Sequence, residues 1–437
     1  MRLIATTILA VLMGWANAQA GTNWPQWRGP NGNGISPSAG LPTRWSQGSE
    51  NITWSAPLPS WSGGSPIVWD DRIFVTSPSK PEDGILQQVT GNDAGGESLL
   101  LLCLSRADGS ELWRRELDTG NDMHRKHNNT SPSPVTDGVL VWAVTGTGMV
   151  TALDMKGQKV WKRDLQKEYG DFGLQWGYAS SPLLVDGKLI VEVLHGQHTD
   201  DPSYVIAFGA AKGELLWRQE RPTDAVAESP DAYTTPALIE HGTRRQIVVS
   251  GGDYATGHDL ATGAELWRLG GLNPEKRHNY RVVGSPVVAG DMLFVPTRKK
   301  PLQAFRLAGG VPGTDPVWTW NGAGAPDVPT PVSDDGYFYM VDDRGMVTCL
   351  DATNGNAVWG PHRTPEGTVS ASPVLADGRL YITNENGVTT VMAAGPQLQQ
   401  LAVNQLDGSY TLSSMAVAGN QLFIRTGTHL YCIAEAD

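Results

Sequence analysis

The sequence repeats one spacing five times: a glycine is followed four residues later by a tryptophan. These pairs are Gly109/Trp113, Gly157/Trp161, Gly213/Trp217, Gly263/Trp267 and Gly355/Trp359. A hydroxyl residue before a proline alternates with them and opens a short apolar run. This second mark falls at Ser65, Ser133, Ser181, Thr235, Ser285, Thr330, Ser372 and, with methionine in place of proline, Ser414. A period of about 40–50 residues is typical of a propeller or another repeat array, here built eight times.

One repeat, residues 181–217, indicates the structure of the unit. After the hydroxyl–proline pair, residues 183–185 form the first short strand, Asp186-Gly187 favours a tight hairpin turn, and residues 188–194 read as a β-branched second strand. Two further short strands are expected at residues 204–208 and 215–217. Four short strands per unit predict an all-β fold, an eight-bladed β-propeller of four-stranded antiparallel blades.

The last repeat supplies only three strands, at residues 412–417, 422–426 and 429–433. A fourth stands at the start of the chain, where residues 51–54 end in a tryptophan of their own. We therefore expect the N-terminal strand to close the last blade and remove the free sheet edge. The expected propeller spans residues 51–437.

The repeated tryptophans have a structural interpretation. A four-stranded sheet cannot bury its faces alone, and a large flat side chain on the outer strand can pack onto the next blade. We expect this packing, rather than ligand binding, for Trp54, Trp113, Trp161, Trp217, Trp267 and Trp359.

The N-terminus has the features of a secretory leader. Arg2 precedes an apolar run at residues 3–15, and Ala18-Gln19-Ala20 forms a cleavage signal. The run is too short to span a membrane, so no transmembrane segment is expected. We expect residues 1–20 to be a signal peptide cleaved after Ala20, with export to the periplasm or beyond and, without a cysteine at the cleavage point, no lipid anchor.

Residues 21–50 carry three tryptophans among glycines and prolines. Disordered segments are poor in aromatic residues, so we expect an ordered arm packed on the propeller. The net charge of −12 argues against nucleic acid as a partner. The expected partner is a protein, a small molecule or a glycan, and the expected state is a monomer.

Candidate ligand contacts lie in the loops that lead into the innermost strands. These loops converge at the axis of a propeller and are rich in polar and aromatic residues. The candidates are Asn129, Trp176, Tyr178, Asp231, Tyr233, Arg281 and Asp327. Such groups favour a polar or cyclic ligand. Alternatively, they hydrogen-bond neighbouring loops and ordered water.

The repeats resemble the PQQ-like (pyrroloquinoline-quinone repeat) family of eight-bladed propellers. The resemblance rests on Asp259-Leu-Ala-Thr-Gly-Ala-Glu-Leu-Trp267 and Asp351-Ala-Thr-Asn-Gly-Asn-Ala-Val-Trp359 and covers about residues 51–437. It implies the propeller fold. It leaves the function open, because the family includes quinoprotein dehydrogenases, BamB-type outer-membrane assembly factors and other proteins.

Three functions remain open. The first is an exported, non-catalytic binding or scaffold protein. The second is a quinoprotein oxidoreductase, which would need PQQ, calcium and an aspartate base. No stretch matches the family's calcium or quinone motifs, so we assign no catalytic residue, metal ligand or cofactor. The third is a polysaccharide- or polymer-binding or -processing propeller, indicated by the aromatic loops.

Overall fold

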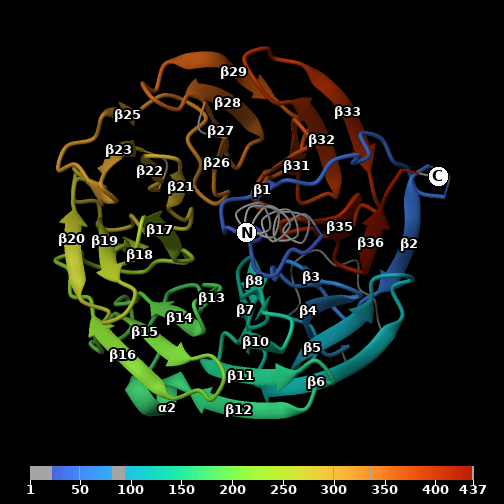
Figure 1. The fold of residues 1–437 in the computed structure, drawn as a ribbon, viewed down its shortest axis with the longest axis horizontal. Helices are drawn as coiled ribbons and strands as arrows, with labels where there is room; N and C mark the ends of the chain where they lie inside the picture. The colour runs from blue at the N-terminus through green and yellow to red at the C-terminus, as the bar shows by residue number, and fades with distance from the viewer. Residues whose placement is uncertain (1–21, 49, 81–93, 299, 335, 436–437) are drawn as a thin grey trace, which may run out of the picture.

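The computed structural model describes residues 22–48, 50–80, 94–298, 300–334 and 336–435. Eight antiparallel sheets surround a central axis, each with its first strand innermost (Figure 1). The expected all-β, eight-bladed propeller is therefore confirmed. The proposed signal peptide lies outside the described residues.

The blades are numbered in chain order from the first complete sheet. Blade 1 holds β3 (Ile67–Trp69), β4 (Arg72–Pro78), β5 (Ser98–Ser105) and β6 (Glu111–Thr119), and blade 2 holds β9 (Val135–Thr136), β10 (Leu140–Val144), β11 (Met149–Asp154) and β12 (Lys159–Asp164). Blade 3 holds β13 (Leu183–Val185), β14 (Lys188–Val193), β15 (Tyr204–Gly209) and β16 (Leu215–Glu220). Blade 4 holds β17 (Ala237–His241), β18 (Arg244–Gly251), β19 (Tyr254–Asp259) and β20 (Glu265–Leu269).

The second half of the ring follows the same order. Blade 5 holds β21 (Val287–Ala289), β22 (Met292–Val295), β23 (Leu302–Ala308) and β25 (Trp318–Trp320), with β24 (Val311–Pro312) beside β23; blade 6 holds β26 (Val332–Ser333), β27 (Tyr337–Val341), β28 (Met346–Asp351) and β29 (Ala357–Arg363); blade 7 holds β30 (Val374–Ala376), β31 (Arg379–Thr383), β32 (Val388–Ala393) and β33 (Gln400–Gln405); blade 8 holds β34 (Ala416–Ala418), β35 (Gln421–Arg425), β36 (His429–Ile433) and β2 (Ile52–Pro57). The helix α2 (Leu165–Tyr169) follows blade 2.

A closed belt of hydrogen bonds joins the inner strands. The backbone N–H of each hydroxyl residue before an inner strand donates to the side-chain oxygen of its counterpart in the next blade. The eight distances lie between 2.8 and 3.2 Å. The bond from Ser414 N–H to Ser65 Oγ, 3.0 Å long, closes the circle. We call these residues the hydroxyl belt: Ser65, Ser133, Ser181, Thr235, Ser285, Thr330, Ser372 and Ser414.

The outer strands are joined by tryptophans. An indole N–H donates to a backbone carbonyl of the next blade at six seams, over 2.8–3.2 Å. The donors are Trp54, Trp113, Trp161, Trp217, Trp318 and Trp359. A Cβ on the turn glycine of the receiving blade would lie only 2.4 Å from the indole at Gly263 and 2.6 Å from it at Gly109. At Gly109, Gly157, Gly213, Gly263 and Gly355 the turn glycine therefore receives the ring of the preceding blade.

Two seams depart from this pattern. Trp267 is half-buried, packs against a cluster that includes Leu293 and Phe305 of blade 5, and donates its indole N–H to Gln246 Oε1 of its own blade over 2.7 Å. Gln246 in turn donates to Gly310 O of blade 5. In blade 7, Ala402 holds the register position that Trp359 holds in blade 6.

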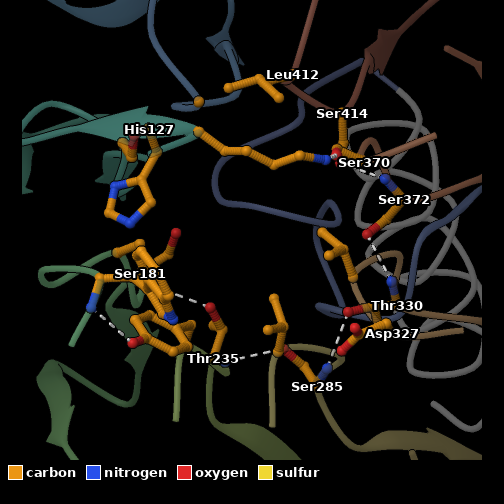
Figure 2. A pocket seen from close by; sticks show the side chains of 18 of the residues that line it. His127, Ser181, Thr235, Ser285, Asp327, Thr330, Ser370, Ser372, Leu412 and Ser414 are labelled. Carbon is orange, nitrogen blue, oxygen red and sulfur yellow. Dashed lines mark hydrogen bonds between the residues drawn. The ribbon is translucent and has the colours of Figure 1, made fainter. Parts of the chain in front are cut away.

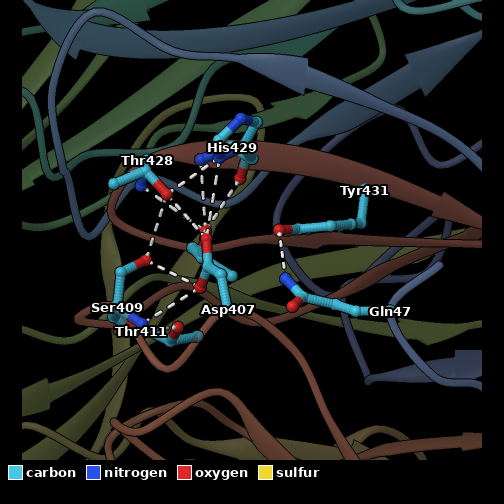
Figure 3. A network of polar contacts seen from close by, with 8 residues as sticks. Gln47, Asp407, Ser409, Thr411, Thr428, His429 and Tyr431 are labelled. Carbon is cyan, nitrogen blue, oxygen red and sulfur yellow. Dashed lines mark hydrogen bonds and ion pairs between the residues drawn. The ribbon is translucent and has the colours of Figure 1, made fainter.

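The N-terminal strand closes the ring as expected. Strand β2 pairs antiparallel with β36, with Trp54 near Cys432 in register. Beside this seam, Asp407 in the loop before β34 accepts hydrogen bonds from two hydroxyls of the turn between β35 and β36, Thr426 Oγ1 at 2.8 Å and Thr428 Oγ1 at 2.6 Å, the latter visible in Figure 3. Burial alone would raise the pKa of Asp407, but these hydroxyls and the Ser409 amide hold it below its ordinary value.

The arm before β2 crosses the end of the channel opposite the inter-blade loops. Trp24 exchanges backbone hydrogen bonds with Val68 near the exit of β3, and β1 (Ile35–Ser36) pairs parallel with β30. Arg28 is buried and donates to the carbonyls of Thr330 and Pro331 in blade 6. The arm thus ties together blades on opposite sides of the axis (Figure 1).

Glu192 is a fully buried carboxyl on β14. Its Oε1 lies 2.7 Å from Thr234 Oγ1, and its Oε2 has no hydrogen-bond partner in the described residues. Thr234 Oγ1 also donates to Ser250 O over 2.8 Å, and one hydroxyl hydrogen cannot serve both acceptors. A protonated Glu192 resolves this by donating to Thr234. Burial raises the pKa of Glu192 to about 8, opposed by Thr234 and by Arg221.

The tryptophan seams predict unequal costs for two matched substitutions. Trp217→Ala should lower the free energy of unfolding by about 3–5 kcal/mol, because it removes a buried ring that fills the space against Gly263. Trp267→Ala, the control, should cost less than half as much, because that ring is half-buried and bonded within its blade. Urea unfolding of both variants measures the difference. Equal losses would contradict the assignment of the seams.

Glu192 predicts a pH-dependent stability. Its folded pKa, about 8, lies above its ordinary value of 4.5, so its contribution is complete below about pH 4.5 and is lost as the pH rises through 8. From pH 5 to pH 9 the wild type should therefore lose stability relative to Glu192→Gln, by several kcal/mol. Urea unfolding at both pH values measures this. Glu240→Gln, at the exposed end of β17, should keep the wild-type profile, and an unchanged profile in Glu192→Gln would contradict the assignment.

Candidate functional site

The centre of the ring holds a cavity of about 450 Å³. Its wall includes the whole hydroxyl belt, together with residues from the inter-blade loops. Part of this belt is visible in Figure 2, where dashed lines link Thr235, Ser285, Thr330 and Ser372. The arm contributes Trp27 to the lining. The residues that build the ring therefore also line its axial cavity.

Four of the seven expected contacts line this cavity. They are Trp176, Tyr233, Arg281 and Asp327, which come from loops between blades 2 and 6. Trp176 donates its indole N–H to Glu228 Oε1 over 2.9 Å, and its backbone N–H donates to Tyr233 OH over 3.0 Å. These bonds hold both aromatic side chains on the cavity wall. Their contact with a ligand stays a prediction.

The other three expected contacts are absent from the cavity lining and bond within the protein. Asn129 donates to Gly120 O and its Oδ1 accepts from His124 Nε2, while Tyr178 donates to Glu192 O over 3.0 Å. Asp231 is fully buried and accepts from the backbone N–H groups of Gln175 and Gln197. Burial raises the pKa of Asp231 to about 6, against these amide bonds. The geometry of these three residues therefore matches the alternative interpretation given above, in which such side chains form hydrogen bonds within the protein.

An open cluster of charges stands on the blade 4–6 side of the cavity. Arg281 Nη2 lies 3.9 Å from Asp327 Oδ2, and Arg298 Nε lies 3.8 Å from the same oxygen. Arg281 Nε lies 3.5 Å from Glu228 Oε1. Charge-assisted hydrogen bonds are about 2.7–2.9 Å long, so these pairs attract each other without closing.

A second carboxylate lies behind this cluster. Asp343 Oδ1 accepts from the backbone N–H groups of Asp327 and Val328, at 3.3 and 3.1 Å. Burial and the neighbouring charge of Asp327 raise the pKa of Asp343. Because it accepts these two backbone N–H groups, Asp343 orients the loop that carries Asp327.

A hairpin leans over the loop side of the cavity. Strands β7 (Met123–His124) and β8 (His127–Asn128) present Arg125 and Lys126 at their turn. The guanidinium of Arg125 lies 5.2 Å from the centre of the Trp176 ring, and Lys126 Nζ lies 2.8 Å from Glu385 Oε1 of blade 7. The hairpin thus spans from the loop after blade 2 to blade 7.

Several lining residues were not among the sequence candidates. Arg298 lies in a basic stretch that reads as an ordinary loop, and Trp27 lies in an arm that the repeat pattern does not cover. The hydroxyl belt has the clearest signal, because its residues recur eight times immediately before an inner strand. In a propeller, that position faces the axis.

The lining does not fit a calcium and quinone site. Among the described residues, no group of three or more His, Cys, Asp or Glu side chains is placed to hold a metal ion. Asp327 lies between two arginines, and Asp343 accepts two backbone amides. The positive charges of the two arginines beside Asp327 disfavour a cation there. Over the described part of the chain, no helix has the length and apolarity needed to cross a bilayer.

Comparisons with known proteins agree with this architecture. The PQQ_2 family model, described as "Outer membrane protein assembly factor BamB", matches residues 97–361 and 281–437. The chain is 23% identical to BamB of Bordetella pertussis over 397 residues, covering 89% of this chain and 88% of the relative. It is 24% identical to BamB of Burkholderia pseudomallei over 326 residues, covering 73% and 74%.

Solved structures share the fold at low sequence identity. BamB from Moraxella catarrhalis has a TM-score of 0.59 and 14% identity, covering 88% of this chain and 98% of its own. Quinohemoprotein alcohol dehydrogenase from Comamonas testosteroni has a TM-score of 0.66 and 12% identity, covering 96% and 81%. Because the family model covers well over half of its residues, the chain belongs to the PQQ_2 family, described as outer membrane protein assembly factor BamB.

Proposed function

We propose that this protein is an exported, non-catalytic scaffold propeller that binds a protein partner and supports outer membrane protein assembly. The proposal is supported by family membership and by relatives named as assembly factors, which this chain matches over most of their length. We further propose that it acts in the periplasm as a monomer, cleaved after Ala20 and without a lipid anchor.

The observation that carries the non-catalytic assignment is the state of the carboxylates near the axis. Asp231 and Asp343 each accept two backbone N–H groups, and Asp327 faces two arginines. A general base must have an oxygen within reach of the proton it removes. These carboxylates are instead used to fix the loops, which suits a rigid binding surface.

Removal of the protein from the organism that makes it tests this proposal. We expect the content of folded outer membrane proteins to fall and to return when the full chain is restored. A chain without residues 1–20 serves as the control, since it should stay in the cytoplasm and restore nothing. Unchanged outer membrane protein content after deletion would contradict the assembly function, and rescue by the leaderless chain would contradict export.

The oxidoreductase alternative has its own test. Titration of the purified protein with calcium and PQQ should give no calcium-dependent shift of the quinone absorbance and no dye reduction with alcohols or sugars. The reason is that no group of three or more His, Cys, Asp or Glu side chains among the described residues is placed to hold the calcium ion. A quinoprotein alcohol dehydrogenase treated in the same way is the positive control. A saturable shift accompanied by dye reduction would overturn the non-catalytic assignment.

A further inference from the structure

The wall of the axial cavity is rich in unused hydrogen-bond donors. Each oxygen of the hydroxyl belt accepts a backbone N–H from the neighbouring blade. Within the described residues, none of these eight hydroxyls donates its hydrogen to a protein acceptor. All eight line the cavity. The same bond that closes the ring therefore leaves a circle of O–H donors toward the axis.

Arg281 adds charged donors to this wall. Its side chain is only 15% exposed, and its contacts to Glu228 and Asp327 are ion pairs at 3.5 and 3.9 Å. In the described part of the chain its guanidinium makes no closer polar contact. A guanidinium has five N–H donors in a fork that matches a carboxylate or phosphate. Arg281 is thus held at the cavity with most of its donors unused.

The cluster around Asp327 is incomplete on both sides. Asp327 is 7% exposed, and its buried Oδ1 has no donor among the described residues, while the buried Nε of Arg298 has no acceptor. A buried polar atom without a partner destabilises the folded protein, so such groups call for a water or a ligand. The 3.8–3.9 Å separations leave both arginines able to turn toward a better acceptor.

The charges of the lining favour an anion. Four cationic residues line the cavity (Arg125, Lys126, Arg281 and Arg298) against two acidic ones (Asp327 and Asp343). Glu385 pairs with Lys126 at 2.8 Å and Glu228 lies 3.5 Å from Arg281, so this excess of two positive charges belongs to the lining residues alone, in a chain whose net charge is −12. A cleft of one sign with low-dielectric walls concentrates ligands of the other sign.

We propose that the axial cavity binds a small ligand carrying a carboxylate or phosphate group, anchored by Arg281 and surrounded by the O–H donors of the hydroxyl belt. Such an oxyanion accepts from Arg281 and Arg298 at closer range than Asp327 does. It reaches the cavity from the loop side, because the arm with Trp27 lies across the other end. The site is separate from the protein-binding function proposed above.

Titration of the purified mature protein with sodium malonate and with inorganic phosphate tests the site. Tryptophan fluorescence and thermal stability report on it, with sodium chloride at equal ionic strength as the reference. We expect saturable binding of at least one anion, weakened by added salt. The two arms distinguish a carboxylate from a phosphate ligand. Arg281→Gln should weaken binding by about tenfold or more, since it removes a charge-assisted hydrogen-bond donor.

Two further variants separate this site from a general charge effect. Asp327→Asn should tighten anion binding severalfold, because it removes the negative charge between the arginines; if that variant does not fold, Arg298→Gln should weaken binding instead. Arg306 is an exposed arginine on β23 that pairs with Asp291 and does not line the cavity. The Arg306→Gln variant should bind the anions as the wild type does.

Three results would overturn the proposal. The first is a lack of saturable binding of both anions, and the second is an unchanged affinity in Arg281→Gln. The third is saturable binding of a neutral sugar such as maltotriose that Arg281→Gln leaves intact, which would favour a glycan site. Because these measurements use purified protein, failure of the assembly function in cells would leave their outcome readable.

Discussion

The hydrogen bond from one blade's N–H to the next blade's hydroxyl is the interaction on which the ring depends. The residue before each inner strand has no sheet partner on its axial side, and a buried backbone N–H needs an acceptor. A serine or threonine of the next blade supplies it. The proline that follows in seven of the eight repeats restricts that residue to an extended conformation, which presents its N–H in the same direction each time. Ser414 keeps the bond although methionine replaces the proline.

The ring uses different side chains at different radii, because the blades lie close together at the axis and diverge toward the rim. Small hydroxyls bridge the short inner distance, and tryptophans fill the wider outer one. The indole lies directly on the glycine of the next turn, at Trp217 and Gly263 for example, where any side chain would collide with the ring. The glycine and the tryptophan of one Gly–Trp pair therefore belong to two different seams. The glycine contacts the preceding blade, and the tryptophan contacts the following blade.

This division explains how much could be predicted from the sequence. The repeat gave the blade count, the strand order and the closing strand, because each depends on residues at fixed spacing. Trp318 was not predicted as a seam residue because it follows Gly313 by five positions and not by four. The indole of Trp267 bonds within its own blade although its spacing from Gly263 is regular. The site was harder. Loop length varies between blades, so spacing cannot tell that Arg281 faces the cavity while Asp231 turns into the wall, or that Arg298 and Trp27 join from a hairpin and from the arm.

The belt also separates what all blades contribute to the cavity from what single loops contribute. Eight repeated hydroxyls give donors without preference for one direction, since they surround the axis evenly. The loops break that symmetry: Arg281, Arg298 and Asp327 all stand on the side of blades 4 to 6. The side chains of Arg281, Arg298 and Asp327 make none of the belt or tryptophan bonds, whereas a change in the belt breaks a bond that holds the ring. The fold therefore permits the charge of the axial site to change while the scaffold around it stays fixed.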